Sequence, residues 1–147
     1  VNMLRKWYRL KKGDLVVLSR LFAPIIMRFS FSFIFIWFGL LKIIGVSPIE
    51  ELVRKTSFLV NEHLFVILLG YFEVAIGICF LFKKLYRLGI ILFFLQVPGT
   101  FIPLFTNRQD CFSIFPYALT LEGQYIFKNF FLIAGALYVF SMLERNR

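Results

Sequence analysis

Four apolar runs, each about as long as a lipid bilayer is thick, constrain this chain more than any other feature of its sequence. They are residues 24–44, 64–82, 88–106 and 125–143. A helix needs about 20 mostly apolar residues to cross the hydrocarbon core of a membrane. The chain of 147 residues is 60% hydrophobic with a mean hydropathy of +0.81, more apolar surface than a soluble core of this size could bury. The sequence therefore predicts an all-α membrane protein, a four-transmembrane-helix bundle.

Basic residues between and beyond the runs predict how the bundle is oriented. They gather before the first run, between the second and third runs, and after the fourth: Arg5, Lys6, Arg9, Lys11, Lys12, Arg20, Lys83, Lys84, Arg87, Arg145 and Arg147. By the positive-inside rule, both termini are expected in the cytoplasm. This placement also accounts for the net charge of +9, so the expected partner is the lipid bilayer and no nucleic acid.

Two segments outside the runs also have a predicted structure. Residues 1–23 mix cations with apolar residues, which predicts a basic amphipathic segment on the anionic inner leaflet, and residues 24–147 form the four-helix transmembrane domain. Ser47-Pro48-Ile49-Glu50 is a capping-box start and predicts a short helix from residue 48 to about residue 61. That helix either joins two spans along the outer membrane surface or acts as a lid over the bundle.

Four charged side chains, Arg28, Lys42, Glu73 and Lys128, lie inside or at the edges of the apolar runs. Each would cost about 2.5 to 3.5 kcal/mol at the centre of a membrane helix. Spacings of three or four place a polar stripe on one face of the first helix, which we expect to face inward: Arg28, Ser32, Phe35, Gly39 and Lys42.

The other three runs carry polar or small residues that we expect to face this stripe. Glu73 lies near the centre of the second run between Gly70 and Gly77, which allow close approach of a neighbouring helix or a flat ligand. Pro98 and Pro103 each remove a backbone hydrogen bond and predict kinks in the third run. The remaining members of the polar set are Gly89, Gln96, Thr100, Glu122, Gln124, Tyr125, Lys128 and Asn129.

Two interpretations of this polar set compete. Buried charges must find partners, so the set could be a structural cluster that fixes the pairing of the four helices. Alternatively, it forms a pocket open toward the outer leaflet, where cations hold an oxygen-bearing head group and Glu73 exchanges a proton. Phe35, Phe72 and Tyr125 are the candidate ring contacts for such a ligand.

The order of motifs along the chain resembles the DoxX-like superfamily, in particular its branch of small inner-membrane proteins that includes a reactive-chlorine resistance membrane protein. The motifs are Arg28, then FIWFGLLK at 35–42, Ser47-Pro48, GYFEVAIG at 70–77 and LTLEGQYIFKN at 119–129. The resemblance implies a bacterial inner-membrane bundle that interacts with quinone, because one branch is a subunit of a thiosulfate:quinone oxidoreductase and another is linked to oxidative-stress complexes. The positions that match the family pattern are Arg28, Gly39, Lys42, Glu73, Gly77, Glu122, Lys128 and Asn129.

The residue types present limit the redox chemistry of the chain. His63 is its one histidine, which excludes a bis-His haem, and we predict neither a metal site nor a covalently bound cofactor. Cys79 and Cys111 are expected on opposite sides of the bundle, so no disulfide is predicted between them. Cys111 is either a plain loop cysteine or a reactive thiol in an oxidising outer compartment.

We therefore expect a quinone-binding membrane protein that serves a redox partner or a larger membrane complex, and at most a membrane subunit of an oxidoreductase. Lys42 and Lys128 would stabilise the carrier's oxygens, and Glu73 would relay a proton under the influence of Arg28. The remaining ligand-binding candidates are Gly39, Gly77, Gln96, Glu122, Tyr125 and Asn129.

Two alternatives to this function stay open. One is a non-catalytic accessory or assembly subunit, whose interface would be a small-residue face such as Gly135 and Ala136. The other is a proton-coupled small-molecule carrier that uses Glu73.

Overall fold

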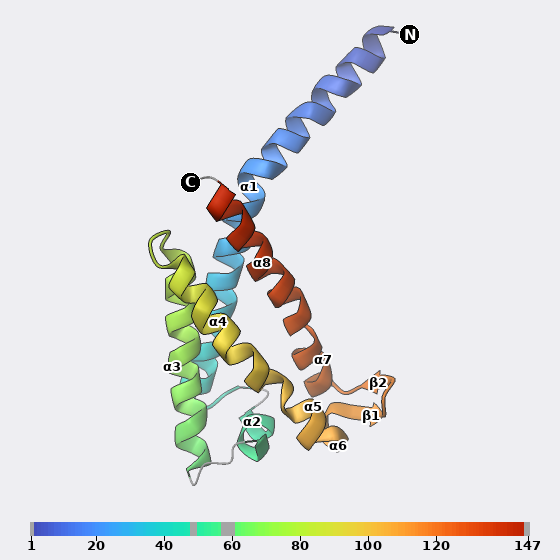
Figure 1. Ribbon diagram of the computed structural model, residues 1–147. Helices are drawn as coiled ribbons and strands as arrows, with labels where there is room; N and C mark the ends of the chain where they lie inside the picture. Colours follow the sequence, from blue (N-terminus) through green and yellow to red (C-terminus); the bar gives the residue numbers. More distant parts are fainter. Residues whose placement is uncertain (1, 48–49, 57–60, 146–147) are drawn as a thin grey trace.

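The four predicted spans are present as four long apolar helical segments in the computed structural model, which describes residues 2–47, 50–56 and 61–145. Within the described residues, four helical segments are long and apolar enough to cross a membrane. They are Asp14–Ile43, His63–Leu81, Tyr86–Thr106 and Leu121–Met142. These spans confirm the predicted all-α architecture with four membrane helices (Figure 1).

The first two spans are single helices, whereas the third and fourth are each built from two. Helices α1 (Asn2–Ile43) and α3 (Glu62–Leu81) carry spans one and two. Span three is α4 (Tyr86–Phe101) followed by α5 (Pro103–Thr106), and span four is α7 (Leu121–Phe127) followed by α8 (Asn129–Arg145). The shorter elements are α2 (Glu50–Thr56), α6 (Arg108–Cys111), β1 (Phe112–Ile114) and β2 (Ala118–Leu119).

The two short strands form an antiparallel hairpin that the sequence did not predict. Phe112 is opposite Leu119, and Ile114 is opposite Ala118. The hydroxyl of Thr120 then donates to the carbonyl of Asp110 at 2.6 Å and accepts from the backbone N–H of Gly123, capping α7. The hairpin therefore fixes where span four begins.

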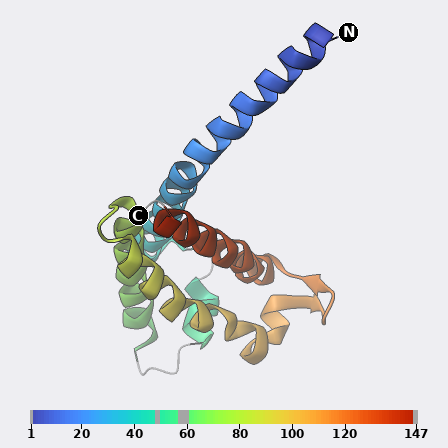
Figure 2. The ribbon, with the colours of Figure 1, turned by 45° about the horizontal axis from the view of Figure 1, so that its top comes forward.

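Helix α1 continues through Pro24 without interruption, so the basic N-terminal arm and the first span form one helix. Figures 1 and 2 show its N-terminal half extending well beyond the other helices. The predicted surface segment, residues 1–23, and the first span therefore share one helix, and the limit drawn between them stays a prediction. Proline is tolerated within membrane helices because neighbouring groups can satisfy the backbone carbonyl that it frees.

The two prolines of the third span behave differently from each other. Pro98 lies inside α4, whereas Pro103 begins a new helix after Ile102. The N–H of Ile102 donates to the carbonyl of Gly99, three residues earlier, at 3.3 Å. In a regular α-helix the acceptor would be four residues earlier. Pro103 has no N–H with which to continue the ladder. The helix of the third span is therefore interrupted before Pro103, where a kink was predicted, whereas it continues through Pro98.

Helices α1 and α3 approach each other closely at glycines. A Cβ on Gly39 would lie 2.6 Å from the carbonyl oxygen of Gly70, and one on Gly77 would lie 2.6 Å from the Ile36 side chain. Both distances are shorter than van der Waals contact allows, so a side chain at either glycine would force the helices apart. The expected close approach of a neighbouring helix beside Glu73 is thus confirmed, and that neighbour is α1.

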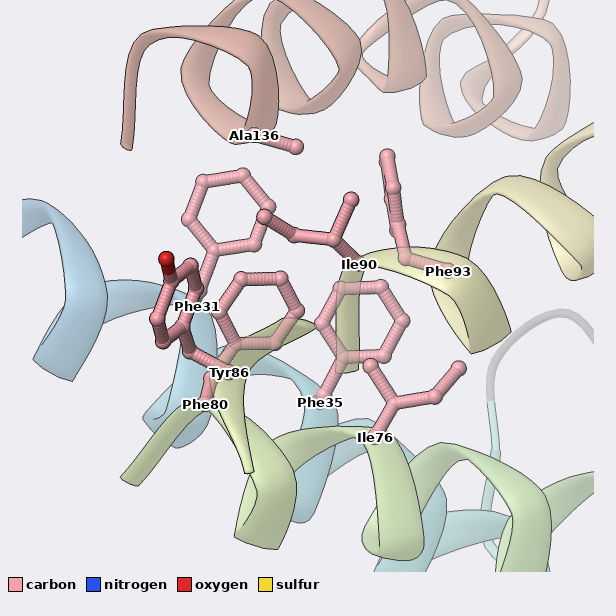
Figure 3. Packing of buried hydrophobic residues seen from close by; sticks show 8 residues of the cluster. All are labelled: Phe31, Phe35, Ile76, Phe80, Tyr86, Ile90, Phe93 and Ala136. Atoms are coloured by element: carbon pink, nitrogen blue, oxygen red, sulfur yellow. The ribbon is translucent and has the colours of Figure 1, made fainter. Parts of the chain in front are cut away.

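The four spans pack in a ring, in which α1 contacts α3, α3 contacts α4, α4 contacts α8 and α8 contacts α1. Aromatic side chains fill the interior of this ring at one end of the helix bundle. Figure 3 shows them directed toward one another from α1, α3 and α4, with Ala136 of α8 above them. The buried members are Phe31, Phe35, Ile76, Phe80, Tyr86, Ile90, Phe93 and Ala136, which we call the aromatic core.

The small residues of α8 take part in this packing. Ala136 is fully buried, and a Cβ on Gly135 would lie 2.8 Å from the ring of Phe31. These two residues, the example of an interface given for the accessory-subunit alternative, are therefore packed inside the chain.

A second, smaller apolar cluster lies at the other end of the ring, where α2, α5, α6 and the hairpin gather (Figure 1). Its buried members are Leu52, Cys111 and Ile126. Leu52 comes from α2, which includes every described residue of the predicted helix from Glu50 to Thr56. Ile49, Leu59 and Val60 lie outside the described residues.

Candidate functional site

A cavity of about 490 Å³ lies inside the ring, between the two apolar clusters. Phe35 and Phe93 of the aromatic core line one part of it, and Leu52 and Ile126 of the second cluster line another. Most of the lining is apolar. The polar residues that line it are Lys42, Glu73, Gln96, Thr100, Tyr125, Lys128 and Asn129.

A buried ion pair joins two of these polar side chains. The Nζ of Lys42 lies 2.6 Å from Oε2 of Glu73, and the two side chains are 3% and 10% exposed. The amide Nε2 of Gln96 donates to the other carboxylate oxygen of Glu73 at 2.9 Å. Both oxygens of Glu73 are therefore held, one by α1 and one by α4. Desolvated charges are tolerated when they are paired in this way.

The amide oxygen of Gln96 is left without a hydrogen-bond partner among the described residues, although it is buried. Its orientation follows from the contact with Glu73, because a carboxylate repels an amide oxygen and attracts the amide NH₂. Buried acceptors are nearly always satisfied in proteins. A water molecule or a hydroxyl-bearing ligand is the kind of donor that would satisfy this one.

Lys128 enters the cavity from the junction of α7 and α8. Its Nζ lies 4.3 Å from the ring centre of Phe38 and 4.2 Å from that of Tyr125. Such contacts stabilise an ammonium group by about 0.5 to 2 kcal/mol, more when it is desolvated. Among the described residues no carboxylate forms an ion pair with Lys128.

Asn129 links the fourth span to the third beside this lysine. Its Nδ2 donates to the hydroxyl of Thr100 at 3.0 Å, and that hydroxyl donates to the carbonyl of Val97 at 2.7 Å. Interhelical hydrogen bonds of this kind contribute roughly 0.6 to 2 kcal/mol in a membrane. The bond holds α8 against α4 at the level of the cavity.

The structure brings together six of the ten residues that the sequence singled out. The six that line the cavity are Lys42, Glu73, Gln96, Tyr125, Lys128 and Asn129. Gly39 and Gly77 do not line it, since they lie at the contact between α1 and α3. Glu122 is half-buried in the first turn of α7, away from the lining.

Arg28 also lies away from the cavity, although its stripe faces inward as predicted. Arg28, Ser32, Phe35, Gly39 and Lys42 are all buried. However, the fourteen residues from Arg28 to Lys42 correspond to about 21 Å along a helix. The cation that meets Glu73 is therefore Lys42, and the expected influence of Arg28 on Glu73 has no direct contact to support it.

Several residues of the cavity wall were not predicted from the sequence. Phe38 was not singled out, although it precedes Lys42 by four residues and so shares its helix face. Leu52 and Val53 of α2 also line the cavity, which agrees with the interpretation of the short helix as a cover. Of the predicted ring contacts, Phe35 and Tyr125 line the cavity, whereas Phe72 packs against the aromatic core.

An ion pair ties α2 to the segment that carries α6. The Nζ of Lys55 lies 3.3 Å from a carboxylate oxygen of Asp110 and 3.3 Å from one of Glu51. Hydrogen bonds to Glu51 and then to Asp110 raise the pKa of Lys55 above its ordinary value. These groups are exposed, so the pair contributes little to stability.

Cys111 is fully buried in the second apolar cluster, and both cysteines are free. Burial, with the nearby carboxylates of Asp110 and Glu122, raises the pKa of the Cys111 thiol. A thiolate is the nucleophilic form of cysteine, so this environment favours the plain over the reactive interpretation of Cys111. His63 is exposed at the start of α3, outside the cavity lining.

In comparisons with protein-family models, curated proteins and solved structures, none matched this chain. The resemblance to the DoxX-like superfamily therefore stays a prediction that rests on the motifs themselves.

Proposed function

We propose that this chain binds a quinone, or a similar lipid-soluble carrier, in the cavity between its four spans and serves a redox or oxidative-stress partner. The observation that carries the proposal is a mainly apolar cavity of about 490 Å³ on which a few polar side chains converge. Sites for small organic ligands commonly measure about 300 to 1,000 Å³ and have this composition. A ring with a lipid tail and two oxygens fits that chemistry.

Four side chains have roles in this proposal. Lys42 and Lys128 supply charged donors to the carrier's oxygens, and preorganised donors in a water-poor site stabilise developing negative charge. Glu73 exchanges a proton at its carboxylate, where Gln96 holds one of its two oxygens in place. When bound, a quinone accepts two electrons and two protons. The electrons come from a partner protein or a larger membrane complex.

The proposed location is the bacterial inner membrane, with both termini in the cytoplasm. The turn between α3 and α4 carries Lys83 and Lys84, and it lies at the same end of the bundle as the C-terminus (Figure 1). This arrangement supports the orientation, because cytoplasmic loops are rich in lysine and arginine. In this orientation α2, α6 and the hairpin lie on the outer side.

The test is to purify the protein in mild detergent, extract it with organic solvent and quantify quinone per chain by mass spectrometry. Wild type is compared with Lys42→Met and Glu73→Gln. Lys84→Met is the matched control, because it removes an exposed lysine outside the cavity. Near-stoichiometric quinone in wild type and control, with a drop in the two folded cavity variants, supports the proposal. Equal trace amounts in all four proteins contradict it.

A proton-coupled small-molecule carrier is the second candidate function. The observation that favours it is that Glu73, a buried carboxyl group, lines a cavity within the spans. Acidic groups at such positions often mark proton pathways. This candidate predicts proton release from the purified protein when substrate is added. The accessory-subunit alternative has lost its expected interface, because Gly135 and Ala136 are covered by α1.

A further inference from the structure

The charged side chains of the cavity do not balance. Lys42 and Glu73 neutralise each other through their 2.6 Å ion pair, and Gln96 occupies the second oxygen of Glu73. Lys128 is the remaining charged group of the lining. Since the charges of Lys42 and Glu73 cancel, the ammonium group of Lys128 gives the lining one excess positive charge.

The two rings around Lys128 leave part of its hydrogen-bonding capacity unused. A lysine ammonium group has three N–H donors. The faces of Phe38 and Tyr125 account for two directions around Nζ, and no hydrogen bond from Nζ to another described residue is present. At least one donor is therefore free for a ligand in the cavity.

We propose that the head group this cavity takes is an anion, an acidic hydroxyl or a carboxylate attached to an apolar body, and that its charged oxygen accepts a hydrogen bond from Lys128. This inference rests on the proposed function, because it names the ligand chemistry of the same site. An unbalanced cation in a mainly apolar cavity gains more from an anionic acceptor than from a neutral carbonyl. Ile34, Val97 and Leu132 supply apolar wall for the body of the ligand.

The test compares two ligands that differ in one ionisable group. The probes are 2-methyl-1,4-naphthoquinone and 2-hydroxy-3-methyl-1,4-naphthoquinone, whose hydroxyl group is ionised at neutral pH. Dissociation constants are measured by calorimetry on the full chain in detergent. We expect the hydroxylated compound to bind wild type at least about tenfold more tightly, the gain of one charge-assisted hydrogen bond.

Variants of Lys128 assign that preference to its charge. Lys128→Met should lose the difference between the two compounds, while Lys128→Arg, which keeps the charge, and Lys84→Met, which leaves the cavity intact, should retain it. If Lys128→Met does not fold, the wild type and Lys128→Arg still give the comparison between ligands. A preference that survives in folded Lys128→Met overturns the role of Lys128.

The remaining outcomes separate this inference from the proposed function. Equal affinity of wild type for the two naphthoquinones overturns the inference and leaves the quinone proposal standing. Decanoate serves as a third probe, an anionic head group on an apolar chain without a quinone ring. Binding of decanoate with no binding of either naphthoquinone supports an anionic ligand and overturns the quinone proposal. Binding of none of the three overturns both.

Discussion

The two ends of the bundle use the same helices in different ways. Around Phe31, Phe80 and Phe93, side chains from three helices fill the interior until almost nothing is exposed. Further along the same helices, the interior holds a cavity of about 490 Å³ and an ion pair. Phe35 and Phe93 belong to both regions and form the boundary between them.

This difference separates stability from binding within one small fold. Dispersion between close-packed groups is a main source of stability between helices in lipid, where apolar surface gains little from leaving the solvent. The filled end supplies that packing. The other end is less tightly packed and holds the Lys42–Glu73 ion pair and the hydrogen bonds of Gln96 and Asn129. We therefore expect substitutions at the two ends to separate loss of fold from loss of ligand.

The largest effect should come from removing an aromatic ring at the filled end. Phe80 is fully buried, so Phe80→Ala should lower the free energy of unfolding by about 3 to 5 kcal/mol. Phe38→Ala makes the same change at the cavity wall, where the ring is only half-buried, and should cost less than half as much. Titration with SDS in mixed micelles, followed by circular dichroism, measures both. Similar losses for the two variants would refute the contrast.

The next largest effect should come from breaking the ion pair. Lys42→Met leaves Glu73 buried without its cation, and broken buried pairs cost about 3 to 5 kcal/mol. We expect the lower end of that range, because a carboxyl group can escape part of the penalty by taking up a proton. The same unfolding titration measures it. The double variant Lys42→Met with Glu73→Gln should recover most of the loss, and a double variant no more stable than Lys42→Met would contradict this account.

A smaller effect should follow from adding one methyl group where α1 meets α3. Gly39→Ala forces Cβ against the carbonyl of Gly70 and should cost about 1 to 3 kcal/mol. Gly99→Ala is the matched control, because a Cβ there meets nothing within 4 Å. Since alanine favours a helix by up to about 1 kcal/mol over glycine, the control should be unchanged or slightly more stable. Thermal unfolding in detergent compares them, and equal midpoints would argue against close packing at Gly39.

The smallest effect should appear at high pH in the second apolar cluster. The folded state raises the pKa of Cys111, chiefly by burial, above its ordinary value of 9.0. The neutral thiol therefore favours folding below that value, and its contribution is lost as the pH rises through the raised pKa. Above pH 9 the free energy of unfolding of wild type should fall more steeply than that of Cys111→Ala. The difference in slope should not exceed about 1.4 kcal/mol per pH unit. Parallel curves would show that Cys111 is not packed as described.

Much of the fold was predictable because membrane spans are encoded locally. Length and hydropathy identified four spans, and spacings of three and four placed the stripe from Arg28 to Lys42 on a buried face. The glycines beside Glu73 predicted a close helix contact, because glycine has no side chain to keep a neighbouring helix away. These properties depend on neighbours within a few turns.

The hairpin and the make-up of the cavity could not be predicted in this way. The short strands depend on contacts such as that of Thr120 with Asp110, ten residues apart. Whether a residue of the polar set reaches the cavity depends on how each helix is rotated in the ring, so Gln96 meets Glu73 while Glu122 stays outside. The continuity of α1 through Pro24 was likewise not evident from the apolar run, which begins at that residue.

The length of α1 sets a hydrophobic mismatch between this protein and its membrane. Its apolar part, Asp14–Ile43, has 30 residues, about 45 Å of helix, whereas the hydrocarbon core measures about 30 Å. A tilt of about 20°, the average for membrane helices, does not absorb that excess. The part from Pro24 to Ile43 alone matches the core, so the ten residues 14–23, seven of them apolar, remain outside it. A thicker bilayer draws these residues into the hydrocarbon and a thinner one expels them, so bilayer thickness determines where the basic arm meets the head groups.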